Sequence, residues 1–228
     1  MGLDDRLRRA YEAIMASSRR ASREDKRRRI IDAAVEVFAA KGFFGARVAE
    51  IAEAAGVADG TIYLYFRSKD EMLISLFEEK MGEINRRFVT LLSQFDDPAE
   101  KLRQYVVEHL ALVAEQPRLM HVLTVELRQS ARFVHEYSPK AFAKYLALLG
   151  SILEEGQRRG VFRRELDNAV FRRALFGAID EIARDWVLRG GAIDAAAVQR
   201  TGDQIASFLL RGLKPDEDAI PVPRLVSR

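Results

Sequence analysis

Apolar residues recur along most of this chain every three to four positions, which is the spacing of amphipathic α-helices. The first clear stripe predicts a helix that ends at Lys41-Gly42, because a glycine suits the position just after a helix. Ser22-Arg-Glu-Asp25 has the spacing of a capping box, so we expect this helix to begin there. A separate stripe within residues 3–15 predicts a further amphipathic helix, packed on its own protein or in contact with a membrane. The stripe of the main helix consists of Ile30, Ala34, Val37 and Phe38.

Shorter helices follow this segment. The pattern predicts a second helix from about Arg47 to Ala55, a turn at Gly56 and a third helix from about Asp59 to Phe66. Ser68-Lys69-Asp70-Glu71 is another capping box, and it opens a fourth helix of about 25 residues. Its length makes it a connector between a small N-terminal domain and a larger helical one.

The remaining helix ends are marked by N-cap residues, prolines and glycines. We expect ends or starts at Asp97-Pro98, Gln116-Pro117, Ser138-Pro139, Gly160, Asp167, Gly190-Gly191 and Asp194. No convincing pair of strands interrupts this series, so the predicted fold class is all-α. The predicted divisions are an N-terminal extension (1–21), a small helical domain (22–68), a larger helical domain (69–213) and a tail (214–228).

Composition narrows the class of protein. The longest stretch without Asp, Glu, Lys or Arg is the nine residues from Tyr145 to Leu153, and a membrane-spanning helix needs ~20 apolar residues. The sequence therefore argues against an integral membrane protein. The N-terminus lacks the apolar core of a secretory signal, and the absence of cysteine excludes disulfides, thiolate nucleophiles and cysteine metal sites. We expect a cytoplasmic protein.

Positive charge is concentrated in the N-terminal 30 residues. Residues 1–30 hold 10 Lys/Arg against 5 Asp/Glu, although the net charge of all 228 residues is only +3. Such a skew indicates that the N-terminal part contacts a polyanion, the alternative being a solvated arm. The arginine-rich residues 19–29 either reach a DNA groove as a flexible arm or remain in solvent.

Residues 48–65 have the spacing of a helix-turn-helix. This motif needs a small residue where its helices cross, a glycine in the turn and apolar residues between them, and an ordinary helical hairpin is the alternative. Ala52 and Gly56 meet the first two needs, and Ile51, Ala55, Val57 and Ile62 meet the third. The second helix of such a pair enters the major groove by its N-terminal turns, which places Asp59, Gly60, Thr61 and Tyr63 at DNA.

The stretch from Phe44 to Lys69 resembles the DNA-binding domain of TetR-type repressors. Its most specific features are Tyr63-x-Tyr65-Phe66 and Ser68-Lys69. By position, the resemblance implies that Arg47, Tyr63, Tyr65 and Lys69 bind phosphates, and that Thr61 reads a base. Asp59 departs from the common family pattern, and its role is left open.

Most of the chain from Lys26 to about Leu213 resembles, within TetR repressors, the FadR-type branch that controls fatty-acid degradation and responds to long-chain acyl-coenzyme A. The similarity lies in Val57–Phe66, Leu73–Met81, Glu126–Ser130 and Phe176–Glu181 with Trp186. It implies an acyl chain in a tunnel among the helices, with the nucleotide nearer the surface. The predicted ligand-binding residues are Tyr105, His109, Leu123, Arg128, Gln129, Phe133, Phe176 and Trp186. Arg128 either grips a phosphate or thioester, or completes a helix end.

The last two helices predict a homodimer. Each carries a wide apolar stripe, and two such helices from each subunit form a four-helix interface that sets two recognition helices on a palindromic operator of double-stranded DNA. The predicted interface residues are Phe171, Ala178, Ile182, Ile205, Phe208 and Leu209.

Enzyme chemistry has little support. The three histidines fit no H-E-x-x-H pattern, none follows a glutamate by three residues, and there is no glycine-rich phosphate loop. We therefore expect neither an enzyme nor a metal or cofactor site. The alternatives to an acyl-coenzyme A sensor are a TetR-type repressor for another hydrophobic molecule, or an architectural protein that binds DNA without sequence preference.

Overall fold

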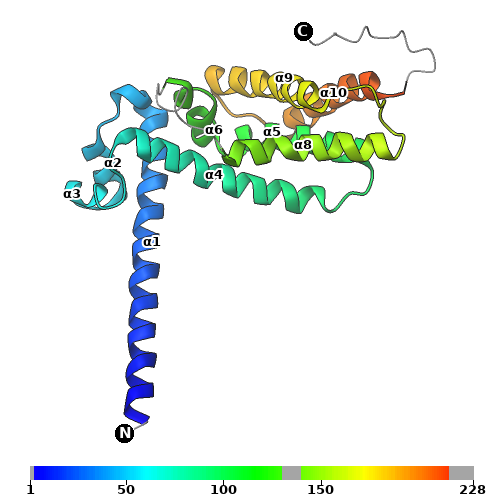
Figure 1. Ribbon diagram of the computed structural model, residues 1–228. Coiled ribbons are helices and arrows are strands. Elements are labelled where there is room, and N and C mark those ends of the chain that lie inside the picture. Colours follow the sequence, from blue (N-terminus) through cyan, green and yellow to red (C-terminus); the bar gives the residue numbers. More distant parts are fainter. Residues whose placement is uncertain (1–2, 130–139, 216–228) are drawn as a thin grey trace, which may run out of the picture. The chain divides into compact units, whose positions relative to one another are not determined.

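The computed structural model describes residues 3–129 and 140–215, with side chains except those of residues 3–14, 16, 128 and 129 (Figure 1). All regular structure in this part of the chain is helical, which confirms the predicted all-α class. None of the described helices is long and apolar enough to span a lipid bilayer.

The chain divides into two compact units. The first comprises Met1–Phe77 and His121–Ser138, and the second Glu78–Met120 and Pro139–Arg228. The division thus falls inside the fourth helix and not at residue 68, and a later segment joins the N-terminal unit. Nothing in the local sequence pattern indicated this return of the chain.

The first unit contains α1 (Leu3–Gly45), α2 (Val48–Ala55), α3 (Asp59–Ile62), the start of α4 (Lys69–Leu92), the end of α6 (Pro117–Thr124) and a 3-10 turn, η1 (Glu126–Gln129). The second contains the rest of α4 and α6 together with α5 (Pro98–Glu115), α8 (Lys140–Arg158), α9 (Asn168–Arg189) and α10 (Ala195–Leu213).

Helix α1 corrects the prediction of a helix start at Ser22. The helix runs unbroken from Leu3, so the two expected N-terminal helices are one. Good helix formers flank Ser22 on both sides, and the Arg20–Glu24 ion pair spans it, so the helix continues through this position. At the other end the prediction was right, because Gly42 breaks the helix with a left-handed φ of 73°.

Helix α3 is shorter than the sequence suggested. It ends at Ile62, and residues 63–65 form a turn in which the Tyr65 and Phe66 amides both donate to the Ile62 carbonyl. The aromatic and β-branched residues of this stretch have weak helix propensity, which favours the early end. Ile62 and Phe66 are both buried and hold the turn against the unit.

The other predicted helix starts are confirmed where the structure describes them. Ser68 accepts a hydrogen bond from the Glu71 amide at 3.1 Å, as an N-cap residue does. Asp97, Asp167 and Asp194 cap α5, α9 and α10 in the same way. The predicted start at Ser138-Pro139 lies outside the described residues, and α8 is described from Lys140.

In the second unit α5 is the central helix, packed against α8, α9 and α10. Its contact with α10 is close because Gly202 faces Val107. A Cβ atom at Gly202 would lie 2.6 Å from Val107 Cγ2, so only glycine fits there.

Candidate functional site

The first unit builds a helix-turn-helix from α2 and α3. Ile51, Ala52 and Ala55 are buried on α2, and Gly56 ends the helix in a left-handed conformation with φ 64° and ψ 41°. The small residue Ala52 and the turn residue Gly56 therefore have the structural positions that the sequence spacing predicted.

The residues predicted to meet DNA lie on the surface of this motif. Asp59 and Gly60 are exposed, Thr61 and Tyr65 are half-buried, and Tyr63 is 60% exposed. Arg47 is exposed at the N-cap position of α2, where its amide donates to Glu50. The contacts of these residues with DNA stay predictions.

Two exposed apolar residues in the same unit escaped the sequence analysis. Leu64 is 72% exposed and Phe44 is 71% exposed. The sequence predicted Leu64 within the third helix. In the structure it lies in the turn that follows α3. The structure exposes an apolar side chain between Tyr63 and Tyr65, and such a chain suits contact with a thymine methyl group.

Lys69 has structural partners that the sequence did not indicate. Its ammonium donates to the main-chain carbonyls of Phe44 and Ala46 at 3.2 and 3.1 Å, and lies 4.7 Å from the centre of the Phe43 ring. Carbonyls at the end of a helix lack partners within it, and these two lie where α1 ends. Lys69 therefore ties the start of α4 to the segment between α1 and α2.

The buried carboxylate of Glu126 also binds the end of α1. Glu126 in η1 is 4% exposed, and its Oε2 accepts a hydrogen bond of 2.7 Å from the Phe43 amide, which follows the break at Gly42. Its Oε1 lies 3.1 Å from His121 Nε2. Glu126 thus anchors the returning segment to the end of α1.

Three predicted ligand residues of the second unit come together in an aromatic cluster. Tyr105 and His109 on α5 are buried beside Tyr145 of α8, and the Phe176 ring of α9 meets His109 edge-on at a centroid distance of 6.0 Å. The Tyr105 hydroxyl donates to the main-chain carbonyl of Tyr145 at 3.3 Å. Tyr145 was not predicted from the sequence, because α5 and α8 are far apart along the chain.

His109 leaves one buried nitrogen unsatisfied. Its Nδ1 lies 2.6 Å from the Tyr145 hydroxyl, whereas its Nε2 is buried without a partner among the described residues. Burial lowers the pKa of His109 to about 4, so the ring is neutral at pH 7.

The proton positions follow from the hydrogen bond between Tyr145 and His109. Burial also raises the pKa of the Tyr145 hydroxyl, which stays protonated. When the Tyr145 hydroxyl donates to Nδ1, the hydrogen of the neutral ring is on Nε2, which has no partner among the described residues. In this tautomer His109 presents a buried N–H donor.

Trp186 makes no ring contact with this cluster among the described residues. Trp186 is half-buried on α9, and Leu123 is half-buried on α6 in the first unit. Phe133 and the side chains of Arg128 and Gln129 lie outside the described residues.

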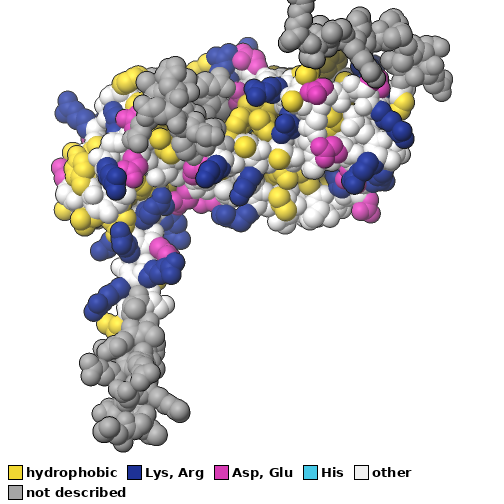
Figure 2. Space-filling view, in the orientation of Figure 1, with side chains coloured by type: hydrophobic (Ala, Val, Ile, Leu, Met, Phe, Trp, Pro, Cys, Tyr) yellow, Lys and Arg dark blue, Asp and Glu magenta, His cyan; other side chains and the backbone are white. Residues whose placement is uncertain are grey.

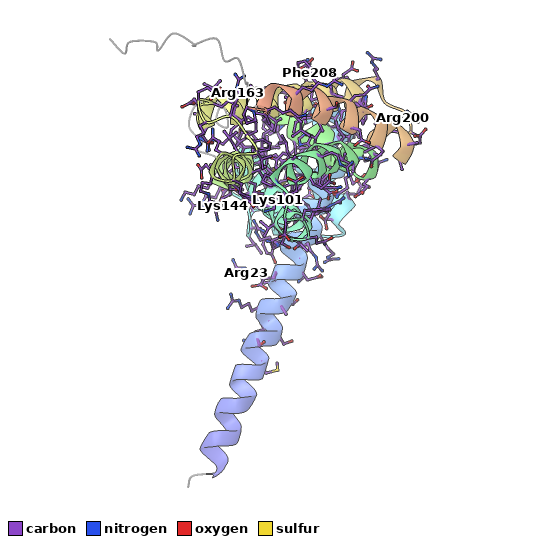
Figure 3. All side chains as sticks on the ribbon, turned by 90° about the vertical axis from the view of Figure 1, so that its right-hand side faces the viewer. Arg23, Lys101, Lys144, Arg163, Arg200 and Phe208 are labelled. Atoms are coloured by element: carbon purple, nitrogen blue, oxygen red, sulfur yellow. The ribbon has the colours of Figure 1, made fainter. Side chains whose placement is uncertain are left out.

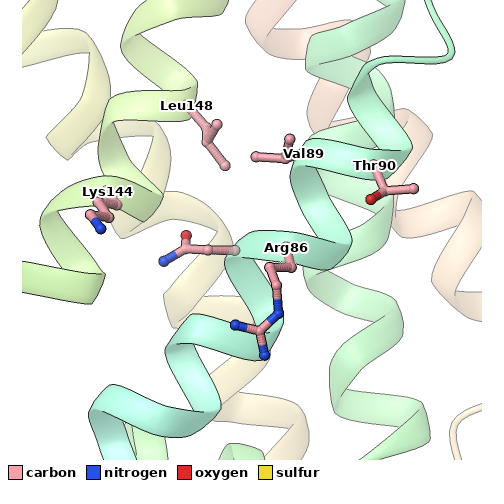
Figure 4. Close-up of a pocket in the computed structure, with 6 residues that line it drawn as sticks. Arg86, Val89, Thr90, Lys144 and Leu148 are labelled. Carbon is pink, nitrogen blue, oxygen red and sulfur yellow. The ribbon is translucent and has the colours of Figure 1, made fainter.

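A groove of about 360 Å³ runs between α4 and α8 of the second unit (Figure 4). Arg86 and Lys144 flank it, and Val89 and Leu148 supply its apolar surface. Asn85, which also lines it, donates from Nδ2 to the Ala141 carbonyl at 2.8 Å and leaves a buried Oδ1 without a partner in the described chain. The sequence did not indicate these residues, since only the packing of the two helices brings them together.

An uncovered apolar face lies on the last two helices. Ala174, Ala178 and Val170 of α9 are exposed, and Phe208 of α10 is 78% exposed and projects from its helix (Figure 3). Ile182, Ile205 and Leu209 are half-buried. Phe171 is 8% exposed, so it packs in the core of its own unit and not on this face, unlike the prediction.

Among residues 3–129 and 140–215, no three His, Asp or Glu side chains converge as metal ligands would.

Parts of both units match known protein families. Residues 30–76 match the family "Bacterial regulatory proteins, tetR family", and residues 77–212 match the family "YsiA-like protein, C-terminal region". The fatty acid metabolism regulator protein of Bacillus subtilis is 39% identical over 184 residues, covering 81% of this chain and 93% of its own length.

Solved structures agree with these matches. The transcriptional regulator FadR of Bacillus subtilis, in complex with stearoyl-CoA, superimposes with a TM-score of 0.75 at 38% identity, over 81% of this chain and 98% of that one. The fatty acid degradation regulator FadR of Bacillus halodurans gives a TM-score of 0.72 at 40% identity, over 82% and 98%. These relatives are regulators and not enzymes, as the sequence predicted. The chain therefore belongs to the TetR family of transcriptional repressors, in the FadR-type branch concerned with fatty-acid metabolism.

Proposed function

We propose that this protein is a homodimeric repressor that binds a palindromic operator in front of fatty-acid degradation genes and leaves it when long-chain acyl-coenzyme A binds. The observation that carries the proposal is the 38% identity, over 81% of the chain, to a regulator solved with stearoyl-CoA. As a DNA-binding regulator it acts in the cytoplasm.

In the proposed complex the surface of α3 and the following turn faces the major groove. Tyr63 has an exposed ring with no partner in the described chain, so its hydroxyl is available to a phosphate oxygen. Arg47 and Tyr65 contact the neighbouring phosphates. Thr61 reads a base, and Asp59 accepts a hydrogen bond from a cytosine amino group. Lys69 adds its charge to this phosphate site while its hydrogen bonds hold the carbonyls of Phe44 and Ala46.

In the proposed dimer the exposed apolar face of α9 and α10 meets its copy across a two-fold axis. Phe208 of α10 and Ala178 of α9 are exposed members of that face. Covering an aromatic ring that is 78% exposed provides part of the hydrophobic driving force.

The proposed effector site combines the groove and the buried cluster of the second unit. Arg86 and Lys144 are placed to bind the phosphates of coenzyme A, and the apolar cluster around Phe176 receives the acyl chain. The unpaired Nε2–H of His109 suits an acceptor such as the thioester carbonyl. Arg128, Gln129, Phe133, Leu123 and Trp186 remain ligand residues that the resemblance implies.

Transmission to DNA then uses elements that belong to both units. Helices α4 and α6 each cross the division, α4 beginning at Lys69 and α6 leading to Glu126. Effector binding shifts the equilibrium by its differential affinity for the two conformations, and a coupling of ~1–3 kcal/mol weakens operator binding about 5- to 150-fold.

The test is an operator-binding titration with acyl-coenzyme A thioesters of increasing chain length, with free coenzyme A and free fatty acid as controls. Affinity for the thioester should rise by nearly fourfold per methylene, ~0.8 kcal/mol each, until the site is full. An R86Q/K144Q variant should lose affinity for the thioester and keep its response to the free acid. Unchanged operator binding with every thioester would leave a repressor for another hydrophobic molecule, and binding without sequence preference would indicate an architectural protein.

A further inference from the structure

The segment of α1 from Ser17 to Lys26 contributes no buried side chain. Every described side chain from Ser17 to Lys26 is exposed, whereas the same helix continues into the buried Ile30 and Ile31. The family matches start only at residue 30, so this part lies outside them. We call residues 17–29 the basic helix.

The basic helix is strongly cationic. It holds seven Lys or Arg and two Asp or Glu, a net charge of +5, whereas the whole chain has +3. Figure 2 shows Lys and Arg side chains spread around it. A helix that is polar on all sides gains no packing energy, and isolated helices are marginal in water. A polyanion would neutralise its charge and stabilise it.

Its charges are not equivalent. Glu24 pairs with Arg20 at 3.0 Å, and Asp25 pairs with Arg28 at 2.6 Å and Arg29 at 3.7 Å. Among the described residues no carboxylate pairs with three further cations, Arg19, Arg23 and Lys26. Their spacing of four and three residues puts them on one face of the helix, together with Ile30.

That face is continuous with the helix-turn-helix. The Arg23 guanidinium lies 5.8 Å from the centre of the Tyr65 ring, and the Arg27 guanidinium lies 5.4 Å from that of Phe66. Arg23 stands out from the helix in Figure 3. Of the three unpaired cations, Arg23 thus adjoins the turn that carries Tyr63 and Tyr65, the proposed phosphate contacts.

We infer that the basic helix is a second DNA-binding element, whose Arg19, Arg23 and Lys26 bind phosphates of the duplex that flanks each operator half-site. Thirteen residues span ~20 Å of helix, or about half a turn of duplex. This inference rests on the proposed function, since it takes the helix-turn-helix to be bound to DNA.

The test compares R19Q/R23Q with R28Q/R29Q, which removes the same charge from two arginines that pair with Asp25. The duplexes are an operator selected by the wild-type protein from a random library, either trimmed to its core or extended by about 10 base pairs on each side. Wild type and R28Q/R29Q should bind the extended duplex more tightly than the core.

For R19Q/R23Q this gain should vanish. The variant lacks two phosphate-binding cations in each subunit of the dimer, so about four fewer phosphates are neutralised and the log–log salt slope should fall by ~3.6. That change is roughly 150-fold less salt sensitivity between about 50 and 200 mM.

Several results would overturn the inference. If the flanks add no affinity for the wild type while the core still binds, the inference fails and the proposed function stands. Equal defects in both variants would reduce it to a general charge effect. A defect confined to binding of phosphatidylglycerol vesicles would make the basic helix a membrane element. If no duplex is bound at all, the proposed function fails with it.

Discussion

Acidification should destabilise this protein through His109, well above the pH at which its carboxylates titrate. The ring is buried, its only hydrogen-bond partner among the described residues is the Tyr145 hydroxyl, and burial lowers its pKa from 6.5 to about 4. A group whose folded-state pKa is lowered in this way binds a proton more readily in the unfolded chain. Between pH 4 and 6.5 the unfolded state therefore holds more protons, and stability falls as the pH falls.

The size of the effect follows from the two pKa values. The gap between the pKa of 6.5 in the unfolded chain and about 4 in the folded chain corresponds to about 3 kcal/mol of unfolding free energy, at 1.36 kcal/mol per tenfold change. About 2 kcal/mol of this is lost between pH ~7.5 and ~5. Carboxylates such as Glu100, whose pKa is lowered below 4.5 by its hydrogen bond with Arg103, titrate below this window.

The assay is urea unfolding followed by circular dichroism at several pH values, at one fixed protein concentration because the proposed dimer would make stability depend on concentration. His109→Gln and His109→Phe both remove the titrating ring, but only Gln keeps a polar partner for Tyr145. Both variants should lose about 2 kcal/mol less than wild type on acidification, whatever their absolute stabilities. Wild-type and variant curves that run parallel from pH ~7.5 to ~5 would refute a buried neutral His109.

Three further predictions concern the other sites. Tyr63→Phe removes a hydrogen bond to a charged phosphate, worth ~1.5–3 kcal/mol, so operator affinity measured by fluorescence anisotropy should fall at least about tenfold on every sequence, whereas Thr61→Val should mainly alter base preference. Ala178→Glu should yield folded monomers in analytical ultracentrifugation, because Ala178 is exposed within one protomer and the carboxylate would be buried unpaired only in the dimer; a stable dimer would place the interface elsewhere. Glu126→Ala should lower the unfolding free energy by ~1–3 kcal/mol in thermal melts by leaving the Phe43 amide unsatisfied, and Glu126→Gln, which keeps an acceptor, should lose less; equal losses would contradict this role.

Local patterns in the sequence determined the helical class and most helix ends. Asp97, Asp167 and Asp194 cap their helices as predicted, because an N-cap bond joins residues only two or three positions apart. The helix-turn-helix was readable for the same reason. Ala52 and Gly56 meet their structural requirements within one short segment.

The local pattern gave the wrong start for α1 and the wrong end for α3, because neighbouring residues and burial favoured a different structure at both positions. Ser22 has the spacing of a capping residue, yet helix formers on both sides carry α1 through it. Helix α3 stops at Ile62, because burial of Ile62 and Phe66 holds a turn where the apolar period alone suggested more helix.

The functional groups of the interior were decided by tertiary structure alone. His109 owes its neutral ring to burial and its hydrogen-bond partner to Tyr145, 36 residues away, and Lys69 finds its carbonyl partners where α1 ends. The groove likewise joins Arg86 of α4 to Lys144 of α8. Sequence periodicity shows which face of each helix is apolar, but it carries no information about which other helix covers that face. Desolvation and pairing of buried polar groups depend on that choice, and packing of the whole unit makes it.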